Sequence, residues 1–142
     1  MSIKICLDAG HYGYYNRSPV NATYYESVMT WKLTNMLEAE LLKYNGVQVV
    51  KTRDNQAVDM ALESRGRCAK GCDLFLSLHS NASGATGTDI DYAIVYRAFD
   101  NLNNADVLAL RLAQGITDVM GLNQSGRTGK RSYVNCLFAL KA

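Results

Sequence analysis

The sequence predicts an α/β fold in which a mostly parallel sheet carries helices on both faces. Short apolar runs of strand length alternate along the chain with segments of helical periodicity, and this alternation is typical of a parallel sheet covered on both sides. The chain has 142 residues, of which 48% are hydrophobic and 20% charged. Those values indicate one globular domain of soluble type, and no repeat or low-complexity tract interrupts it.

The first half of the chain predicts strand, helix and strand. Residues 3–10 begin as an apolar run rich in β-branched residues and break at Gly10. A loop rich in Tyr, Asn and Ser follows, and from about Tyr25 the apolar residues recur at helical spacing. That helical stripe comprises Met29, Leu33, Met36, Leu37 and Leu41. Asn45 and Gly46 suit a helix end, because both tolerate the left-handed conformation, and residues 47–52 predict the next strand.

The second half continues the alternation. Residues 59–69 predict a helix with Asp59 as its N-cap. Apolar runs at 74–79 and 90–97 predict two strands, and residues 104–121 predict a helix. A loop rich in Gly and Ser then leads to a last apolar run at 133–140.

Charge and composition exclude several classes of protein. The net charge is +2, and the longest basic cluster, "GRTGKR" at 126–131, fits a solvated loop better than a nucleic-acid patch. No apolar stretch approaches the roughly 18 residues of a membrane span, and the N-terminus has no signal-peptide pattern. We therefore expect synthesis in the cytoplasm with the four cysteines reduced. Cys68 and Cys72 lack the second Cys/His pair of a zinc finger.

Both histidines of the chain lie where a predicted strand gives out. His11 follows the first strand and His79 ends the strand at 74–79. Glu26 begins the first long helix, and the carboxyl ends of parallel strands and the starts of the following helices share one sheet edge. Two imidazoles and one carboxylate form a ligand set for catalytic zinc. The alternatives are ordinary ones: hydrogen-bonded polar residues at strand ends and a first-turn acid favoured by the helix dipole.

These residues bring a family resemblance. "LDAGH" at 7–11, Glu26 at a helix start, "SLHSNA" at 77–82 and the stretch 49–82 between the sites together resemble the zinc-dependent N-acetylmuramoyl-L-alanine amidases of the amidase-3 type. The resemblance covers the whole chain, so residues 1–142 are expected to form an amidase-like catalytic domain with a twisted, mostly parallel sheet. It implies that His11, Glu26 and His79 bind Zn²⁺. It also implies hydrolysis of the amide between N-acetylmuramic acid and L-alanine in bacterial peptidoglycan.

The resemblance fails at the C-terminus. The family continues into a proline-led strand that ends in an acid/base glutamate, whereas this sequence has no glutamate after Glu63. We therefore expect a C-terminally incomplete domain, and no catalytic acid/base residue is assigned. Loss of a general acid/base costs on the order of 10²–10⁴-fold in rate. A missing strand would also leave an unpaired sheet edge, which invites self-association.

Other residues are candidates for substrate and supporting contacts. The loop tyrosines Tyr12, Tyr14 and Tyr15 offer flat faces and hydroxyls to sugar or peptide, and Asn81 is the fourth candidate for substrate binding. Tyr24 belongs to the same loop. The histidine ligands need acceptors for their second ring nitrogens, and Asp8, Ser80 and Asn81 are the nearest in sequence.

Several functions compete at this stage. The chain could be an active cell-wall amidase, acting at the wall as a phage lysis protein or a released autolysin. It could instead be a weak or inactive peptidoglycan-binding domain that keeps the zinc site. A zinc carboxypeptidase is disfavoured, because such enzymes have His and Glu three residues apart, whereas His11 and Glu26 are fifteen apart. "GRTGK" lacks the spacing of a P-loop.

Overall fold

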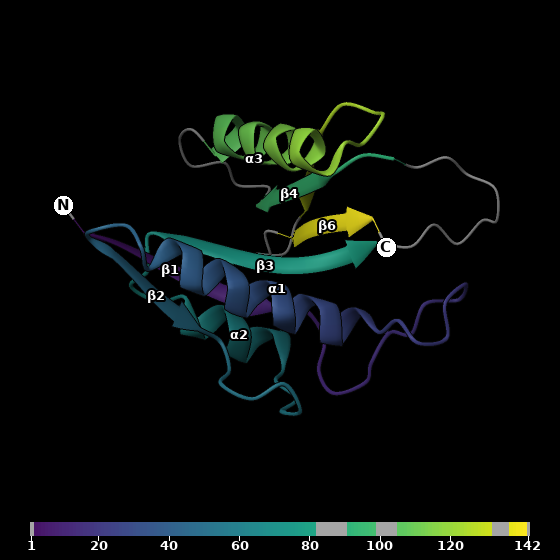
Figure 1. The fold of residues 1–142 in the computed structure, drawn as a ribbon. Coiled ribbons are helices and arrows are strands. Elements are labelled where there is room, and N and C mark those ends of the chain that lie inside the picture. Colours follow the sequence, from purple (N-terminus) through teal and green to yellow (C-terminus); the bar gives the residue numbers. More distant parts are fainter. Residues whose placement is uncertain (1, 82–90, 99–104, 132–136, 142) are drawn as a thin grey trace. The chain divides into compact units, whose positions relative to one another are not determined.

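The structure is a computed structural model that describes residues 2–81, 91–98, 105–131 and 137–141. Two compact units divide the chain, Met1–His79 and Ser80–Ala142, and Figure 1 shows their helices and strands. The elements in chain order are β1 (Ile3–Ala9), α1 (Glu26–Leu41), β2 (Val47–Lys51), α2 (Leu62–Cys68), β3 (Leu74–Asn81), β4 (Ile94–Ala98), α3 (Ala105–Met120), β5 (Arg127–Arg131) and β6 (Leu137–Lys141). The predicted α/β fold is confirmed.

The first unit is built on three parallel strands in the order β2-β1-β3. Ile3 of β1 pairs with Val47 of β2, and Ala9 pairs with Leu78 of β3. The central strand is the most buried, with a core that includes Ile5, Cys6, Leu7, Leu76 and Leu78. Because all three strands run the same way, their carboxyl ends meet at one edge, as the sequence predicted.

Helices α1 and α2 cover opposite faces of these strands. Leu7 of β1 is in register with Lys51 of β2, and the Lys51 ammonium donates to Glu38 of α1 at 2.6 Å. Asp8 is the next residue along β1 and so points to the other face, where it pairs with Arg65 of α2 at 3.2 Å. The expected arrangement of helices on both faces is therefore present in this unit.

Helix α1 packs on the sheet through a polar side. Its buried residues are Glu26, Ser27, Thr30 and Thr34. The hydroxyls are satisfied locally, since Thr30 Oγ1 donates to the carbonyl of Gly10 at 2.8 Å and Thr34 Oγ1 to that of Thr30 at 2.7 Å. The apolar stripe found in the sequence contributes none of these buried residues, and Met36 is 66% exposed. These hydroxyls can be buried because each one has a hydrogen-bond acceptor within reach.

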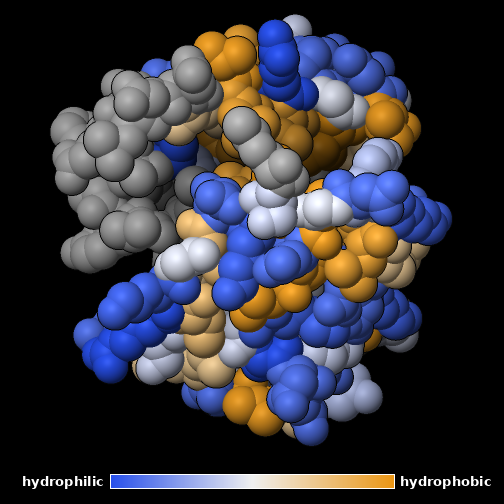
Figure 2. All heavy atoms as spheres, turned by 90° about the vertical axis from the view of Figure 1, so that its left-hand side faces the viewer, coloured by the Kyte–Doolittle hydropathy of each residue, from blue (hydrophilic) through white to orange (hydrophobic). Residues whose placement is uncertain are grey.

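The second unit contains β4, β5, β6 and α3. Strand β4 lies between β5, to which it is parallel, and β6, to which it is antiparallel. Ala109, Ala113 and Thr117 form the buried side of α3, and a Cβ on Gly126 would lie 2.4 Å from the Ala113 carbonyl carbon. Hydrophobic residues also reach the surface, among hydrophilic ones, on the face shown in Figure 2.

Some predicted boundaries are wrong. Helix α2 begins at Leu62 with Ala61 as its N-cap, so Asp59 does not cap it. Strand β3 runs two residues beyond His79, to Asn81. The basic cluster predicted to be a loop forms β5. Residues 90, 104 and 133–136 of the predicted elements lie outside the described residues. No helix among the described ranges has the length and apolar character needed to span a bilayer.

Candidate metal centre

Three segments of the first unit bring His11, Glu26 and His79 together. His11 lies two residues after β1, Glu26 is the first residue of α1, and His79 lies near the end of β3. His11 Nε2 is 3.1 Å from Glu26 Oε2, and His79 Nδ1 is 3.0 Å from Glu26 Oε1. The two imidazole rings meet edge to face with their centroids 5.1 Å apart. Glu26 is 2% exposed, whereas both histidines are half-buried and reachable from solvent.

This cluster fits a metal ion by its donor chemistry and spacing. One ligand atom from each residue lies within 4.8 Å of the others, and no second group of this kind occurs among the described residues. Ligand atoms on a tetrahedral zinc, with bonds of about 2.0–2.1 Å, lie about 3.3 Å apart. The two contacts between a histidine and Glu26, at 3.0 and 3.1 Å and one to each carboxylate oxygen, come close to that value. Two imidazoles and one carboxylate also leave a fourth position free for water.

The end of β1 is shaped for close approach of His79. The N–H of Gly10 donates to the Leu78 carbonyl at 2.9 Å, which continues the β1–β3 pairing past Ala9. A Cβ on Gly10 would lie 2.6 Å from His79 Cε1 and 2.7 Å from His79 Nδ1. Only a glycine therefore leaves room for the His79 ring at this point. His11 itself has a φ of 59°, a left-handed conformation that non-glycine residues rarely adopt.

Two buried arginines hold the backbone at His11. Arg53 Nη2 donates to the carbonyls of Ala9, at 2.9 Å, and His11, and Arg65 donates to the same two carbonyls at 2.8 and 3.3 Å. Burial, followed by the nearby Arg65 charge, lowers the pKa of Arg53. The Arg53 Nε is buried without a hydrogen-bond partner in the described part of the chain. Burial of the two guanidinium groups and of the unpaired Arg53 Nε lowers stability, but the arginines hold the backbone where His11 has a positive φ.

Asp8 holds Arg65 on the face of the sheet that α2 covers. Its carboxylate accepts hydrogen bonds from Thr52 at 2.7 Å and Ser77 at 2.6 Å, and it pairs with Arg65. Asp8 was a candidate acceptor for a histidine ligand in the sequence analysis. In the structure its carboxylate contacts Thr52, Ser77 and Arg65. Ser80 is buried.

The loop before α1 closes back onto Glu26. The Asn16 side-chain amide donates to Glu26 Oε2, and the Asn16 carbonyl accepts the Glu26 N–H at 3.0 Å. The Ser27 hydroxyl donates to the Gly13 carbonyl at 2.7 Å and accepts the Tyr15 N–H at 2.9 Å. The first turn of α1 is thus tied to the loop by both backbone and side-chain bonds.

Of the predicted substrate-binding tyrosines, Tyr15 lies against His11, whereas the Tyr14 ring packs edge to face on Tyr25. The Tyr15 ring stacks on His11 with centroids 5.5 Å apart, and Tyr12 stacks on Tyr15 at 5.6 Å. Tyr14 is 79% exposed and Tyr15 54% exposed. Asn81 is the last residue of β3, and its side chain lies outside the described residues.

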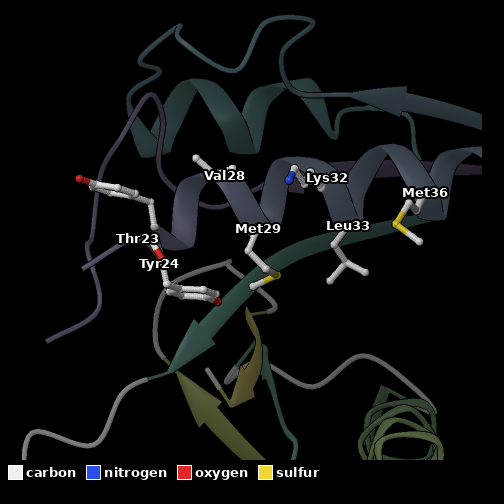
Figure 3. Close-up of a pocket in the computed structure, with 8 residues that line it drawn as sticks. Thr23, Tyr24, Val28, Met29, Lys32, Leu33 and Met36 are labelled. Atoms are coloured by element: carbon white, nitrogen blue, oxygen red, sulfur yellow. The ribbon is translucent and has the colours of Figure 1, made fainter. Parts of the chain in front are cut away.

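An open groove of about 420 Å³ runs beside α1 (Figure 3). Its apolar lining comes from the helical stripe recognised in the sequence, with Met29, Leu33 and Met36 on one side of the helix. Tyr24, Tyr25 and Lys32 also line it. Glu26 and Thr30 belong to the buried side of α1, so the groove and the metal centre use different sides of one helix.

Among the described residues, neither the thiols nor the downstream carboxylates belong to this cluster, and Cys136 lies outside those residues. Burial, with the neighbouring thiols of Cys72 and Cys68, raises the pKa of Cys6 to about 12, and all three of these cysteines are free. After His79, Asp91 accepts from Asn123, Asp106 pairs with Arg97, and Asp118 accepts from Gln114. Asp89 and Asp100 lie outside the described residues.

Sequence reasoning found the three clustered residues but missed their supports. The supports are Gly10, Asn16, Arg53 and Arg65. A Gly immediately before His11 and an Asn within a long loop were available signals, since both residue types mark left-handed or close-approach positions.

Comparison with known proteins places the chain in context. A family model described as N-acetylmuramoyl-L-alanine amidase matches residues 5–140. No curated protein matches the sequence.

Three solved structures share the fold. An N-acetylmuramoyl-L-alanine amidase from Clostridium difficile superposes with a TM-score of 0.78 at 21% identity, over 89% of this chain and 69% of its own. The catalytic domain of an N-acetylmuramoyl-L-alanine amidase from Bacillus (Paenibacillus) polymyxa gives a TM-score of 0.77 at 19% identity, over 98% and 79%. An N-acetylmuramoyl-L-alanine amidase of Nostoc punctiforme gives 0.73 at 21% identity, over 92% and 70%. At these identities the likeness establishes the fold.

Proposed function

Since this chain belongs to the N-acetylmuramoyl-L-alanine amidase family, we propose that it hydrolyses the amide between N-acetylmuramic acid and L-alanine in bacterial peptidoglycan, using one Zn²⁺ ion. The observation that carries the proposal is the convergence of His11, Glu26 and His79 within 4.8 Å. The proposal takes residues 1–142 as one amidase-like catalytic domain that acts at the cell wall. Its route there, as a phage lysis protein or a released autolysin, stays a prediction.

The three residues would hold the ion through the atoms that already face one another. These atoms are Nε2 of His11, Nδ1 of His79 and a carboxylate oxygen of Glu26. Bound zinc supplies a water of lowered pKa, near 7, and polarises the scissile carbonyl. Burial of Glu26 keeps its carboxylate away from competing water, while the half-exposed histidines leave the open side to substrate.

The tyrosines beside His11 are proposed to orient the substrate. Tyr15 stacks on the His11 ring and is half exposed, so its ring edge and hydroxyl can contact a sugar or a peptide next to the reacting amide. Tyr12 supports Tyr15 from behind by a second stack. Asn81 follows the site along β3, and we retain it as a candidate contact to substrate.

The test is zinc content and amide cleavage in paired variants. Wild-type protein purified in metal-free buffer and then loaded should carry one zinc per chain and should release, from purified peptidoglycan, peptides that have alanine at their amino terminus. His79→Ala and Glu26→Gln should carry little zinc and release none. Glu38→Gln is the matched control, because Glu38 is a carboxylate of the same helix that pairs with Lys51. Equal zinc in Glu26→Gln and Glu38→Gln would contradict the metal assignment.

A separate outcome tests the substrate. If zinc binds as expected but no amide is cleaved, the chain acts as a zinc-holding binding domain. If the freed amino group belongs to a residue other than alanine, the chain cleaves a different bond. Either result makes the proposed hydrolysis wrong. Tyr15→Ala should weaken binding of a muramoyl-peptide fragment. An unchanged titration would remove that tyrosine from the substrate site.

A further inference from the structure

We propose that Asn16 is a positioning residue that holds Glu26 in the geometry of a metal ligand. The inference rests on the proposed zinc function of His11, Glu26 and His79 and assigns a role to a residue outside that set. Asn16 would act through Glu26 and touch neither metal nor substrate.

Asn16 binds Glu26 at two places. Its side-chain Nδ2 donates to Oε2, the same carboxylate oxygen that faces His11 Nε2 at 3.1 Å. Its backbone carbonyl accepts the Glu26 N–H at 3.0 Å. One residue therefore restrains both the backbone and the carboxylate of Glu26. A hydrogen bond to a carboxylate is charge-assisted and about twice as strong as a neutral one.

The backbone of the loop is arranged to make this double contact. Asn16 has a φ of 57°, a left-handed conformation that Asn tolerates better than most residues. Arg17 forms an antiparallel bridge with Tyr25, and Ser18 donates to the Tyr24 carbonyl at 2.9 Å, so the loop returns to the helix as a closed turn. This turn brings Asn16 against the first residue of α1.

The same contacts replace a helix cap. Helix α1 begins after Tyr25, whose side chain makes no capping hydrogen bond. The first two N–H groups of the helix, at Glu26 and Ser27, donate to the carbonyls of Asn16 and Tyr15 at 3.0 and 3.4 Å. The loop supplies what a Ser or Asp at the N-cap usually provides. The position of Glu26 therefore depends on this loop rather than on its own helix alone.

A positioned carboxylate binds metal better than a free one. Glu26 lies between two imidazoles and could rotate to favour either oxygen toward the ion. Asn16 fixes Oε2 and so limits this rotation. Residues that hydrogen-bond a metal ligand typically contribute about 10–100-fold to metal affinity.

The experiment compares two identical substitutions in one loop. Asn16→Gly removes the amide and keeps the left-handed backbone, because Gly adopts positive φ readily. Asn21→Gly is the control, since Asn21 accepts hydrogen bonds from Thr23 in the same loop at 3.0 and 2.8 Å. Zn²⁺ affinity is measured by competition with a chromophoric chelator, and unfolding of the metal-free protein is followed by circular dichroism.

We expect Asn16→Gly to bind Zn²⁺ about tenfold or more weakly, with Asn21→Gly close to wild type. Asn16→Asp should be weaker still, because it keeps the backbone preference but places a second carboxylate against Glu26. A loop role without positioning would lower the affinity equally in the two Gly variants and leave Asn16→Asp near wild type, and this result would overturn the inference. Wild-type affinity in Asn16→Gly would also overturn it and leave the zinc proposal standing. A wild-type protein that binds no Zn²⁺ would overturn both.

Discussion

Gly10→Ala is the sharpest test of how the site is packed. The added Cβ would lie 2.6 Å from His79 Cε1, whereas carbon atoms pack at about 3.5 Å or more. The ring or the backbone must then shift by about 0.9 Å. The second obstacle, the Leu78 carbonyl oxygen at 2.6 Å, is backbone held in the β1–β3 pairing, so the pairing must open there while the His79 ring also moves.

Such a shift exceeds what a metal site tolerates. Metal–ligand distances hold to within about 0.2 Å, so a displacement several times larger removes His79 as a useful ligand. We expect the Zn²⁺ affinity of Gly10→Ala to fall by at least about 10–100-fold, the loss usually seen when only a supporting residue is removed. Overpacking should also lower the free energy of unfolding by about 1–3 kcal/mol.

The assay is chelator competition for Zn²⁺ alongside urea unfolding of the metal-free protein. Gly66→Ala is the control: Gly66 lies inside α2, and a Cβ there would meet nothing within 4 Å. That variant should bind zinc normally and gain about 0.5–1 kcal/mol of stability from helix propensity. If Gly10→Ala bound zinc as tightly as Gly66→Ala, the close packing of Gly10 and His79 would have no role in the site.

Two further predictions concern buried residues of the first unit. Arg65→Met should lower the free energy of unfolding by about 3–5 kcal/mol, because it leaves buried Asp8 unpaired, whereas exposed Arg67→Met, which breaks a surface pair with Glu63, should cost less than about 1 kcal/mol in the same urea titration. Similar losses would show that the buried pair is not special. Cys6 is fully buried and its pKa is raised to about 12, so iodoacetamide at pH 8 should modify Cys68 and Cys72 first, and mass spectrometry finding Cys6 labelled as fast would refute this.

The fold was largely predictable because its strands carry strong signals. The apolar runs at β1 and β3 and the helical spacing of α1 identify the parallel unit without any contact information. Strand β5 escaped prediction because "RTGKR" has the composition of a loop. It forms a strand by pairing with β4, where Gly129 stands opposite Tyr96 and a Cβ would lie 2.6 Å from the Tyr96 ring. Pairing of this kind is a tertiary effect that local propensity cannot report.

The candidate site was predictable in its members but not in its supports. His11, Glu26 and His79 could be grouped because parallel topology places strand ends and helix starts at one edge. The contacts of Asn16 and the arginines could not be grouped in that way. They depend on where a long loop returns and on carbonyls exposed by a left-handed residue, and neither follows from periodicity. The buried side of α1 could not be predicted either, because a pattern of Ser and Thr residues does not indicate a buried helix face.

The buried hydroxyls of α1 determine how precisely Glu26 is held along the helix axis relative to the sheet. A helix that packs on a sheet through apolar side chains can shift slightly along its axis, since dispersion contacts have no preferred direction. Here Thr30 is bonded to the Gly10 carbonyl at 2.8 Å and Ser27 to the Gly13 carbonyl at 2.7 Å. A slip along the axis by one residue's rise, about 1.5 Å, would strain these bonds beyond useful length. The two hydrogen bonds therefore fix the position of α1 along its axis relative to the segment that follows β1, and they fix the position of the Glu26 carboxylate with it.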